Sequence, residues 1–165
     1  MNDLIALVVA VAICFAAAAV GGYATTRSLR DWYVALPKPS WNPPNWVFGP
    51  VWTVLYLAMA VAAWLVWRAR DERDVAPALV WFAAQLVLNV AWSVVFFGLR
   101  APKAGLAVIV GLWLAILGTI LAFVPISTPA AAILAPYLLW VTFATALNGA
   151  IVRTPPPAAC PLGWS

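Results

Sequence analysis

Hydrophobic residues along this chain form long runs, separated by short polar stretches. The runs that are nearly free of charge are Leu4–Tyr23, Pro43–Trp67, Pro77–Leu99, Ala104–Val124 and Pro129–Val152. Each reaches the roughly 20 residues that a helix needs to cross about 30 Å of hydrocarbon. None alternates like a membrane β-strand, and a spanning segment must satisfy its own backbone hydrogen bonds. The pattern predicts an all-α membrane protein, a bundle of five transmembrane helices with an ordered first loop.

Composition supports lipid as the solvent of this chain. Of its 165 residues, 66% are hydrophobic and 8% are charged, whereas soluble domains carry about 25% charged residues. The first run lacks a basic n-region, since only Asp3 precedes its apolar core, so we expect a retained helix and not a signal peptide. We predict one domain over residues 1–152. The Pro-rich tail, residues 153–165, cannot be helical through its prolines and is expected to be disordered.

The net charge of +4 reflects membrane topology and not a nucleic-acid partner. One side of the predicted membrane has the basic residues Arg27, Arg30, Lys38, Arg100, Lys103 and Arg153, and the other has Arg68, Arg70 and Arg73. Basic loops stay in the cytoplasm. The N-terminus is therefore expected outside and the C-terminus in the cytoplasm.

Prolines and tryptophans crowd the start of the second run, "WNPPNWVFGPVW". We expect Asn42 to cap this helix, with Pro43 and Pro44 in its first turn. Pro50, one turn further in, removes a backbone donor and predicts a kink. Pro136 predicts a second kink in the fifth run.

The four tryptophans of this segment are expected to play different roles. Trp41 and Trp46 lie at headgroup depth, where an interfacial aromatic belt explains them. Trp52 lies deeper, where a belt does not explain it.

Three predicted helices have faces of aromatic and amide side chains at helical spacing. These faces are Phe48, Trp52, Tyr56 and Met59; Trp81, Gln85, Asn89, Trp92, Ser93 and Phe96; and Tyr137, Trp140, Ala144 and Asn148. Amides in lipid need partners, so these faces point into the bundle. They either form hydrogen bonds between helices or line a ligand cavity that is mostly apolar with a few polar groups.

The residues that are missing exclude several functions. The chain contains no His, and no charged residue lies within a predicted span. This excludes His-ligated haem, carboxylate metal sites, and Ser-His or Cys-His nucleophilic catalysis. We therefore expect no metal, no resident cofactor and no conventional catalytic machinery.

Three motifs in order identify a family resemblance. They are "DWYxxLPKPSWNPPxWVFxxVWTxLY" over Asp31–Tyr56, "QLxLNxAWSxxFFG" over Gln85–Gly98 and "PYLLWVTFATALN" over Pro136–Asn148. The chain resembles the TspO/MBR family, the tryptophan-rich sensory proteins of bacteria and the mitochondrial translocator protein, once called the peripheral benzodiazepine receptor. The resemblance implies a five-helix bundle in a bacterial cell membrane, often a homodimer.

The same resemblance implies the ligands and the site. Expected ligands are protoporphyrin IX, haem, and isoquinoline carboxamide or benzodiazepine compounds. The position that the sterol motif requires to be Tyr or Phe holds Gly149 here, so sterol binding is not expected. Porphyrin propionates are expected to reach Arg27, Arg30 or Lys38. The expected ligand-binding residues are Tyr33, Pro43, Phe48, Val51, Trp52, Tyr56, Gln85, Asn89, Trp92, Trp140, Ala144 and Leu147.

Three functional hypotheses follow. The first is a receptor or transporter-like protein that binds tetrapyrroles in their regulation or in a stress response. The second is an enzyme that degrades protoporphyrin IX with light and oxygen, with Trp52 and Trp140 as electron-rich partners. The third is a scaffold whose aromatic residues only pack.

Overall fold

The computed structural model describes residues 2–29, 31–36 and 38–154, and they contain no strand. Five stretches of helix are long and apolar enough to span a membrane. They are Asp3–Ser28, Asn45–Arg68, Ala76–Gly98, Pro102–Phe123 and Thr128–Arg153. Each overlaps one predicted run, so the all-α architecture with five spans is confirmed. The expected disorder of the tail concerns residues that, from 155 onward, lie outside this description.

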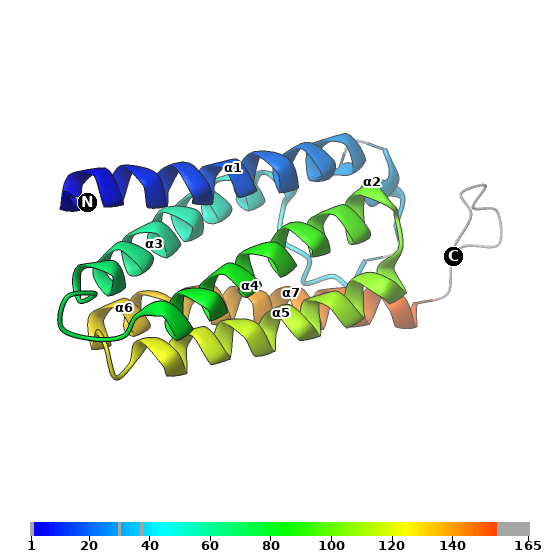
Figure 1. Cartoon of the computed structure of the whole chain (residues 1–165). Helices are drawn as coiled ribbons and strands as arrows, with labels where there is room; N and C mark the ends of the chain where they lie inside the picture. Colours follow the sequence, from blue (N-terminus) through cyan, green and yellow to red (C-terminus); the bar gives the residue numbers. More distant parts are fainter. Residues whose placement is uncertain (1, 30, 37, 155–165) are drawn as a thin grey trace.

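The spans form a closed ring. Their helices are α1 (Asp3–Leu29), α3 (Phe48–Arg68), α4 (Ala76–Ser93) with the π-helix η2 (Val94–Gly98), α5 (Pro102–Phe123), and the pair α6 (Thr128–Ile133) and α7 (Ala135–Arg153). α1 contacts α3 and α4, α4 contacts α5, α5 contacts α7, and α3 contacts α6 (Figure 1). The connection after α1 holds the short helix α2 (Trp32–Ala35) and the 3-10 turn η1 (Asn45–Val47).

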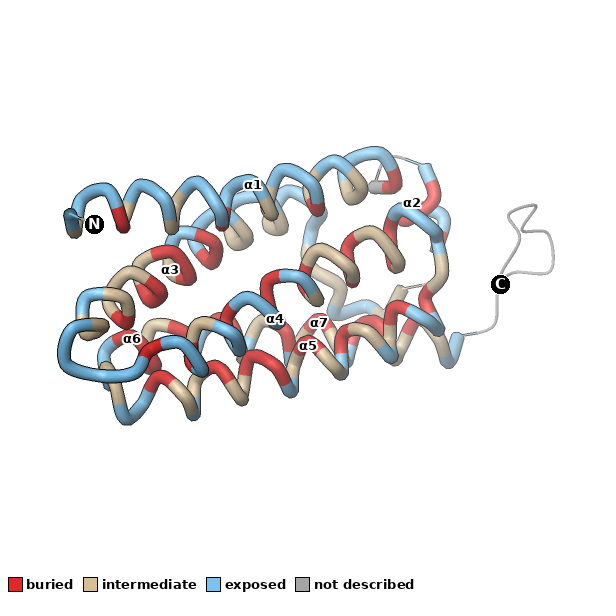
Figure 2. The backbone as a smooth tube through the Cα atoms, viewed as in Figure 1, coloured by how far each residue is buried: buried red, intermediate tan, exposed pale blue. Residues whose placement is uncertain are grey.

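α1 is the least buried of the five spans. In its most apolar window 17% of the residues are buried, against 33–39% in the other four. Figure 2 shows the same contrast, with exposed residues along most of α1 and buried residues where the remaining helices face one another. α1 therefore packs on α3, α4 and η2 along one side and leaves most of its surface exposed. This arrangement positions the cavity described below.

α1 also extends further than its hydrophobic run predicts. The run ends at Tyr23, yet the helix continues to Leu29. Within this extension the hydroxyls of Thr25 and Thr26 find acceptors on the preceding turn, Thr25 Oγ1 donating to Gly21 O at 2.8 Å and Thr26 Oγ1 to Tyr23 O at 3.3 Å. Arg27 therefore lies in the last turn of a helix and not in a loop.

The predicted start of the second span is wrong by several residues. Pro43 and Pro44 precede the helical residues, which begin with η1 at Asn45 and continue as α3 from Phe48. Asn42 does not cap the helix, because its side chain accepts a hydrogen bond from Tyr33 Oη and donates to Pro43 O. Pro50 consequently sits in the first turn of α3, where a missing N–H is tolerated. It marks the helix start and does not kink an interior turn.

The kink predicted at Pro136 is observed as an interruption of the fifth span just before the proline. α6 ends at Ile133 and α7 begins at Ala135, with Leu134 between them. Pro136 occupies the first turn of α7, as prolines do in the first turns of α4, α5 and α6. Ser127 caps α6 by accepting from Ala130 N at 3.4 Å.

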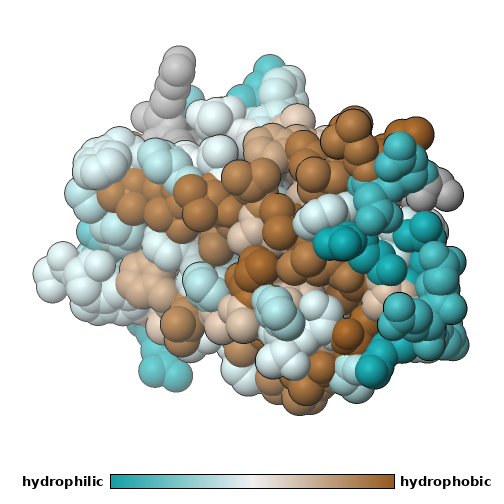
Figure 3. All heavy atoms as spheres, turned by 90° about the vertical axis from the view of Figure 1, so that its left-hand side faces the viewer, coloured by the Kyte–Doolittle hydropathy of each residue, from teal (hydrophilic) through white to brown (hydrophobic). Residues whose placement is uncertain are grey.

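At the end of the bundle that contains the N-terminus, charged residues connect neighbouring helices and loops. Asp3 pairs with Arg68 at 3.1 Å and with Arg70 at 3.7 Å. Trp64 Nε1 donates to Asp3 O at 2.9 Å, and Arg73 donates to Pro125 O. Figure 3 views this end of the molecule, where hydrophilic side chains gather along one side and hydrophobic ones cover much of the rest. The bundle thus has one end whose charges are largely matched.

Candidate functional site

A hydrogen-bond network joins three helices inside the ring. Tyr56 Oη of α3 donates to Asn89 Oδ1 of α4 at 2.6 Å, and Asn89 Nδ2 donates to Tyr137 Oη of α7 at 2.7 Å. Tyr137 Oη donates in turn to Gln85 Oε1 at 3.0 Å. All four residues are buried, and Asn89 is 0% exposed. Of the two interpretations of these amides, hydrogen bonding between helices and lining of a ligand cavity, the structure favours the first.

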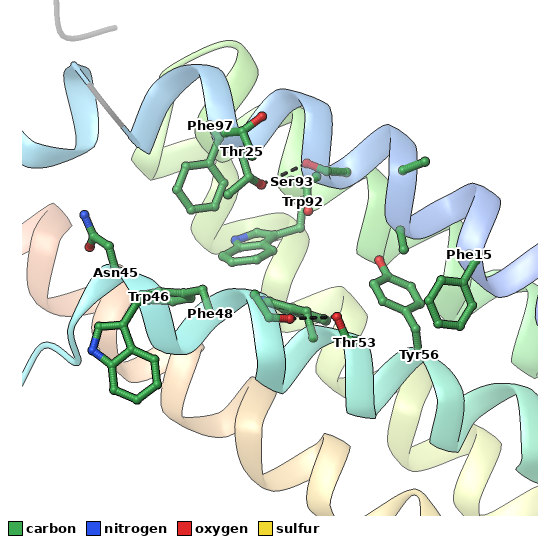
Figure 4. Close-up of a pocket in the computed structure, with 17 residues that line it drawn as sticks. Phe15, Thr25, Asn45, Trp46, Phe48, Thr53, Tyr56, Trp92, Ser93 and Phe97 are labelled. Atoms are coloured by element: carbon green, nitrogen blue, oxygen red, sulfur yellow. Dashed lines mark hydrogen bonds between the residues drawn. The ribbon is translucent and has the colours of Figure 1, made fainter.

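An aromatic-lined cavity of about 580 Å³ lies beside this network, between α1, α3 and α4 (Figure 4). Of the predicted site residues, it is lined by Phe48, Trp52, Tyr56 and Trp92. Tyr56 therefore borders the cavity with its ring and joins the network with its hydroxyl. Ligand sites are typically 300–1,000 Å³ in volume and are mostly apolar with few polar groups. This cavity has the size and lining of such a site.

Glycines of α1 and α3 shape the aromatic-lined cavity. A Cβ at Gly21 would lie 3.1 Å from Ser93 Oγ, so glycine allows α1 to approach α4 closely. A Cβ at Gly22 or Gly49 would meet no atom within 4 Å, and both residues line the cavity. The cavity therefore owes part of its width to two glycines, one on α1 and one on α3.

Trp52 is the central aromatic ring of the cavity. Its ring centroid lies 5.8 Å from that of Tyr56, 6.4 Å from that of Trp92 and 6.3 Å from that of Tyr137. Aromatic pairs at such distances stabilise one another by about 0.5–1.5 kcal/mol beyond burial. Trp52 is thus held rigidly while part of its surface faces the cavity.

The outer rim of the cavity is polar without being charged. Thr25 and Thr26 lie near the end of α1 and Asn45 lies at the start of η1, and none of the lining residues is charged. The expected contact of propionates with Arg27 or Lys38 finds no support. Arg27 borders a different cavity, and Lys38 Nζ donates to the carbonyl oxygens of Tyr33, Val34 and Leu36. Arg30 lies outside the described residues.

Trp46 has the exposure expected of an interfacial residue and also contacts the cavity. It is 75% exposed, and it is one of the residues that line the cavity. Trp41 is 48% exposed and packs its ring edge against Phe143, outside the cavity. The two tryptophans assigned to one interfacial belt therefore occupy different positions.

Tyr33, in the short helix α2 of the first connection, is buried against the bundle. It is 1% exposed, and its hydroxyl donates to Asn42 Oδ1 at 2.9 Å. Burial raises the pKa of Tyr33 to about 12 and lowers the pKa of Lys38. Asn42 Nδ2 donates to Pro43 O at 3.0 Å, so Pro43 belongs to this closed loop.

The remaining predicted residues lie in two other places. A small gap of about 20 Å³ is bordered by Tyr33, Phe48, Trp92, Ala144 and Leu147. Val51 and Trp140 border an open groove between α3 and α7. Phe48 connects the regions, since its ring lies 6.0 Å from that of Trp140. The buried indole N–H of Trp140 has no hydrogen-bond partner within the described part of the chain. Buried polar groups without partners are rare in folded proteins.

Sequence reasoning missed the contribution of α1 to this site. Phe15, Gly21, Gly22, Thr25 and Thr26 line the cavity although the first run was interpreted only as a spanning helix. A signal existed in "GGYATT", where small and hydroxyl residues interrupt an apolar run. Trp81 was expected on the inward stripe of α4, but it is 47% exposed and lies against Gly118 of α5.

Comparison with known proteins agrees with this architecture. The family model described as "TspO/MBR family" matches residues 10–153. The "Tryptophan-rich protein TspO" of Chlorobaculum tepidum is 42% identical over 156 residues, which cover 94% of this chain and 99% of that protein. The "Tryptophan-rich sensory protein" of Cereibacter sphaeroides is 42% identical over 139 residues, 82% of this chain and 86% of that protein.

An animal protein is similar over a somewhat shorter stretch. The human "Translocator protein" is 42% identical over 125 residues, which cover 74% of this chain and 73% of that protein. The family match spans four of the five helices completely and most of α1. With its five apolar helices and its aromatic cavity, this chain is a multi-pass membrane protein that belongs to the TspO/MBR family.

Proposed function

We propose that this protein binds a tetrapyrrole, protoporphyrin IX or haem, in the cavity between α1, α3 and α4. The observation that carries the proposal is the pair of indole rings Trp52 and Trp92, 6.4 Å apart and inclined by 33°, on the wall of a cavity of about 580 Å³. A flat, apolar macrocycle gains both burial and stacking on such a wall.

The polarity of the cavity suits an amphiphilic ring. The apolar part of the macrocycle would lie against Trp52 and Phe48, and its carboxylates would lie at the rim beside Thr25 and Asn45. The Asn45 amide can donate a hydrogen bond to a carboxylate there, and the Thr25 hydroxyl can do so once it turns away from Gly21 O, to which it donates in this structure. The chain has no His, so stacking and burial would hold haem without His ligation. Such a site fits a receptor or transporter-like protein.

Membership in the family supports two associated proposals, and the distribution of basic residues supports a third. Isoquinoline carboxamide and benzodiazepine compounds would compete with the porphyrin for the same aromatic walls. The chain would form a homodimer in a bacterial cell membrane. The excess of basic residues at the end opposite the N-terminus would place that end in the cytoplasm, with the N-terminus outside.

A second candidate function is light- and oxygen-dependent degradation of the bound porphyrin. The clustering of Trp52 with Tyr56, Trp92 and Tyr137 favours it, because these rings are oxidisable and adjacent to the cavity. The porphyrin would absorb the light and molecular oxygen would supply the added oxygen atoms. Aerobic illumination of the complex should then generate a bilin-like absorbance band that is absent in the dark and without oxygen.

Filling the cavity from its glycines tests the binding proposal. Gly22→Leu and Gly49→Leu should each weaken protoporphyrin binding about tenfold or more, since overfilling a packed site costs about 1–3 kcal/mol. The folded protein should tolerate both changes, because the new Cβ meets no atom within 4 Å. Affinity is measured in the dark as saturable quenching of tryptophan fluorescence on titration with protoporphyrin IX in detergent.

Gly111→Leu is the matched control. Gly111 lies on α5, away from the cavity, and a Cβ there also meets no atom within 4 Å. This variant should bind like the parent protein. Binding that is equally tight in all three variants would place the porphyrin elsewhere. An absence of saturable quenching in the parent protein would favour the scaffold hypothesis.

A further inference from the structure

A second cavity, of about 620 Å³, lies beside the end of α1. It is bordered on α1 by Val20, Ala24 and Arg27, and on the facing side by Val94, Gly98 and Arg100. Residues 20, 24 and 27 occupy the face of α1 opposite residues 18, 22 and 25, which line the aromatic cavity, because each residue turns the helix by about 100°. The two cavities are therefore separated by α1.

Both walls of this cavity change from apolar to cationic in the same direction. Along α1 the lining begins at Val20 and Ala24 and ends at Arg27 in the last turn. Along the facing wall it begins at Val94 and Gly98 of η2 and ends at Arg100, past the helix. Helix ends of spanning segments lie at the headgroup level of a bilayer. The cavity thus has an apolar part at membrane depth and a cationic part at the surface.

The two arginines lack the partners that arginines have at the other end of the bundle. There, Arg68 pairs with Asp3 at 3.1 Å. Within the described residues, neither Arg27 nor Arg100 takes part in an ion pair; the guanidinium of Arg27 lies 4.9 Å above the Tyr23 ring. Asp31 also borders the cavity, which leaves its rim with two positive charges and one negative charge. The rim is suited to a group with negative charge.

The backbone at Arg100 is unusual. Among the described residues it is the one non-glycine with a positive φ, at 55°. That left-handed region favours glycine, and side chains kept there are often functional. Arg100 follows the π-helix η2, in which Leu99 N donates to Val94 O at 2.8 Å, and π-helical turns also concentrate at functional sites. Ser28 Oγ donates to Phe97 O and ties α1 to this turn. An arginine is thus held where a glycine would be less strained.

We propose that this cavity binds an anionic glycerophospholipid, whose phosphate lies between Arg27 and Arg100 and whose acyl chains lie along Val20, Ala24 and Val94. A free phosphate ion would use the rim but would leave the apolar walls uncovered. A phospholipid covers both parts, and basic pockets between spanning helices are known to suit lipid headgroups. The site is distinct from the aromatic cavity and does not depend on what binds there.

Arg100→Gly is the most informative variant, because it removes the charge and relieves the backbone at once. Its melting temperature in phosphatidylcholine should equal or exceed that of the parent protein. Its affinity for phosphatidylglycerol, measured by native mass spectrometry from mixed micelles, should fall about fivefold, as expected for one surface cation facing an anionic lipid. Arg27→Gln should weaken phosphatidylglycerol binding by a similar factor.

Lys103→Ala provides the control for general surface charge. Lys103 lies at the same end of the bundle, at the start of α5, but does not border the cavity. It should leave phosphatidylglycerol binding unchanged. The proposal is overturned if the parent protein binds phosphatidylcholine as tightly as phosphatidylglycerol, or if Lys103→Ala weakens binding as much as Arg100→Gly. Displacement of the lipid by inorganic phosphate alone at millimolar concentration would instead identify a free-anion site and also overturn it.

Discussion

Trp52→Ala is expected to weaken protoporphyrin IX binding by about 30-fold or more, which corresponds to about 2 kcal/mol. Trp52 presents a ring to the cavity and is held by Tyr56, Trp92 and Tyr137. Buried aromatic residues at the centre of a binding site commonly contribute this much, because both stacking and apolar burial are lost on truncation. The measurement is a dark titration of tryptophan fluorescence, with porphyrin absorbance as a second readout.

Trp41→Ala is the matched variant for this effect. Trp41 is also a tryptophan in contact with one aromatic ring, that of Phe143, but it lies outside the cavity. Its removal should change porphyrin affinity less than about threefold, within the usual variation for residues outside a binding centre. Trp52→Phe should fall between the two, since phenylalanine keeps a smaller ring. Equal losses for Trp41 and Trp52 variants would contradict the assigned cavity.

Asn89→Leu is expected to lower the free energy of unfolding by about 1–2 kcal/mol, with little change in ligand affinity. The substitution removes the acceptor of Tyr56 Oη and the donor to Tyr137 Oη, both buried. Hydrogen bonds between membrane helices average about 0.6 kcal/mol and reach about 1.7 kcal/mol. Asn89 makes two of them, so its loss should be near the upper end. Thermal unfolding in detergent, followed by circular dichroism, measures the effect.

A double-mutant cycle with Tyr56→Phe separates the network from simple packing. Tyr56→Phe should destabilise the parent protein but should have little further effect in the Asn89→Leu background, where its partner is already missing. Additive effects would show that the two groups act independently. A loss of porphyrin affinity at unchanged stability would show that Asn89 contacts the ligand, the other interpretation of its position.

Much of the fold could be predicted without coordinates. Lipid contains no hydrogen-bond partners for the backbone, so apolar runs of the right length must be helices, and each of the five runs corresponds to a spanning helix. The break before Pro136 was also predictable, because proline cannot donate to the preceding turn. The exact start of α3 was not. The Asn42 side chain contacts Tyr33 of the preceding loop, and a contact of that kind is invisible in local sequence.

The site was only partly predictable. Helical spacing correctly indicated that Tyr56, Gln85 and Asn89 point inward, since an amide in lipid must find a partner. Helical spacing could not show whether these side chains form hydrogen bonds with one another or line a ligand cavity, because the answer depends on the distance between the helices. Trp52 and Trp140 have similar positions in their helices, yet they border different cavities.

The sequence by itself determined the solvent, the number of spans, the family resemblance and most of the inward-facing residues of three helices. The family resemblance rests on three sequence motifs, and the others follow from composition and periodicity within single segments. Only the tertiary structure decided where empty space lies. Gly21 lets α1 approach Ser93, while Gly22 and Gly49 face open space. Glycines therefore have two different effects here: one allows close helix packing and two leave space unfilled. The sequence cannot distinguish these effects, because a cavity depends on how helices pack against one another and not on any one helix.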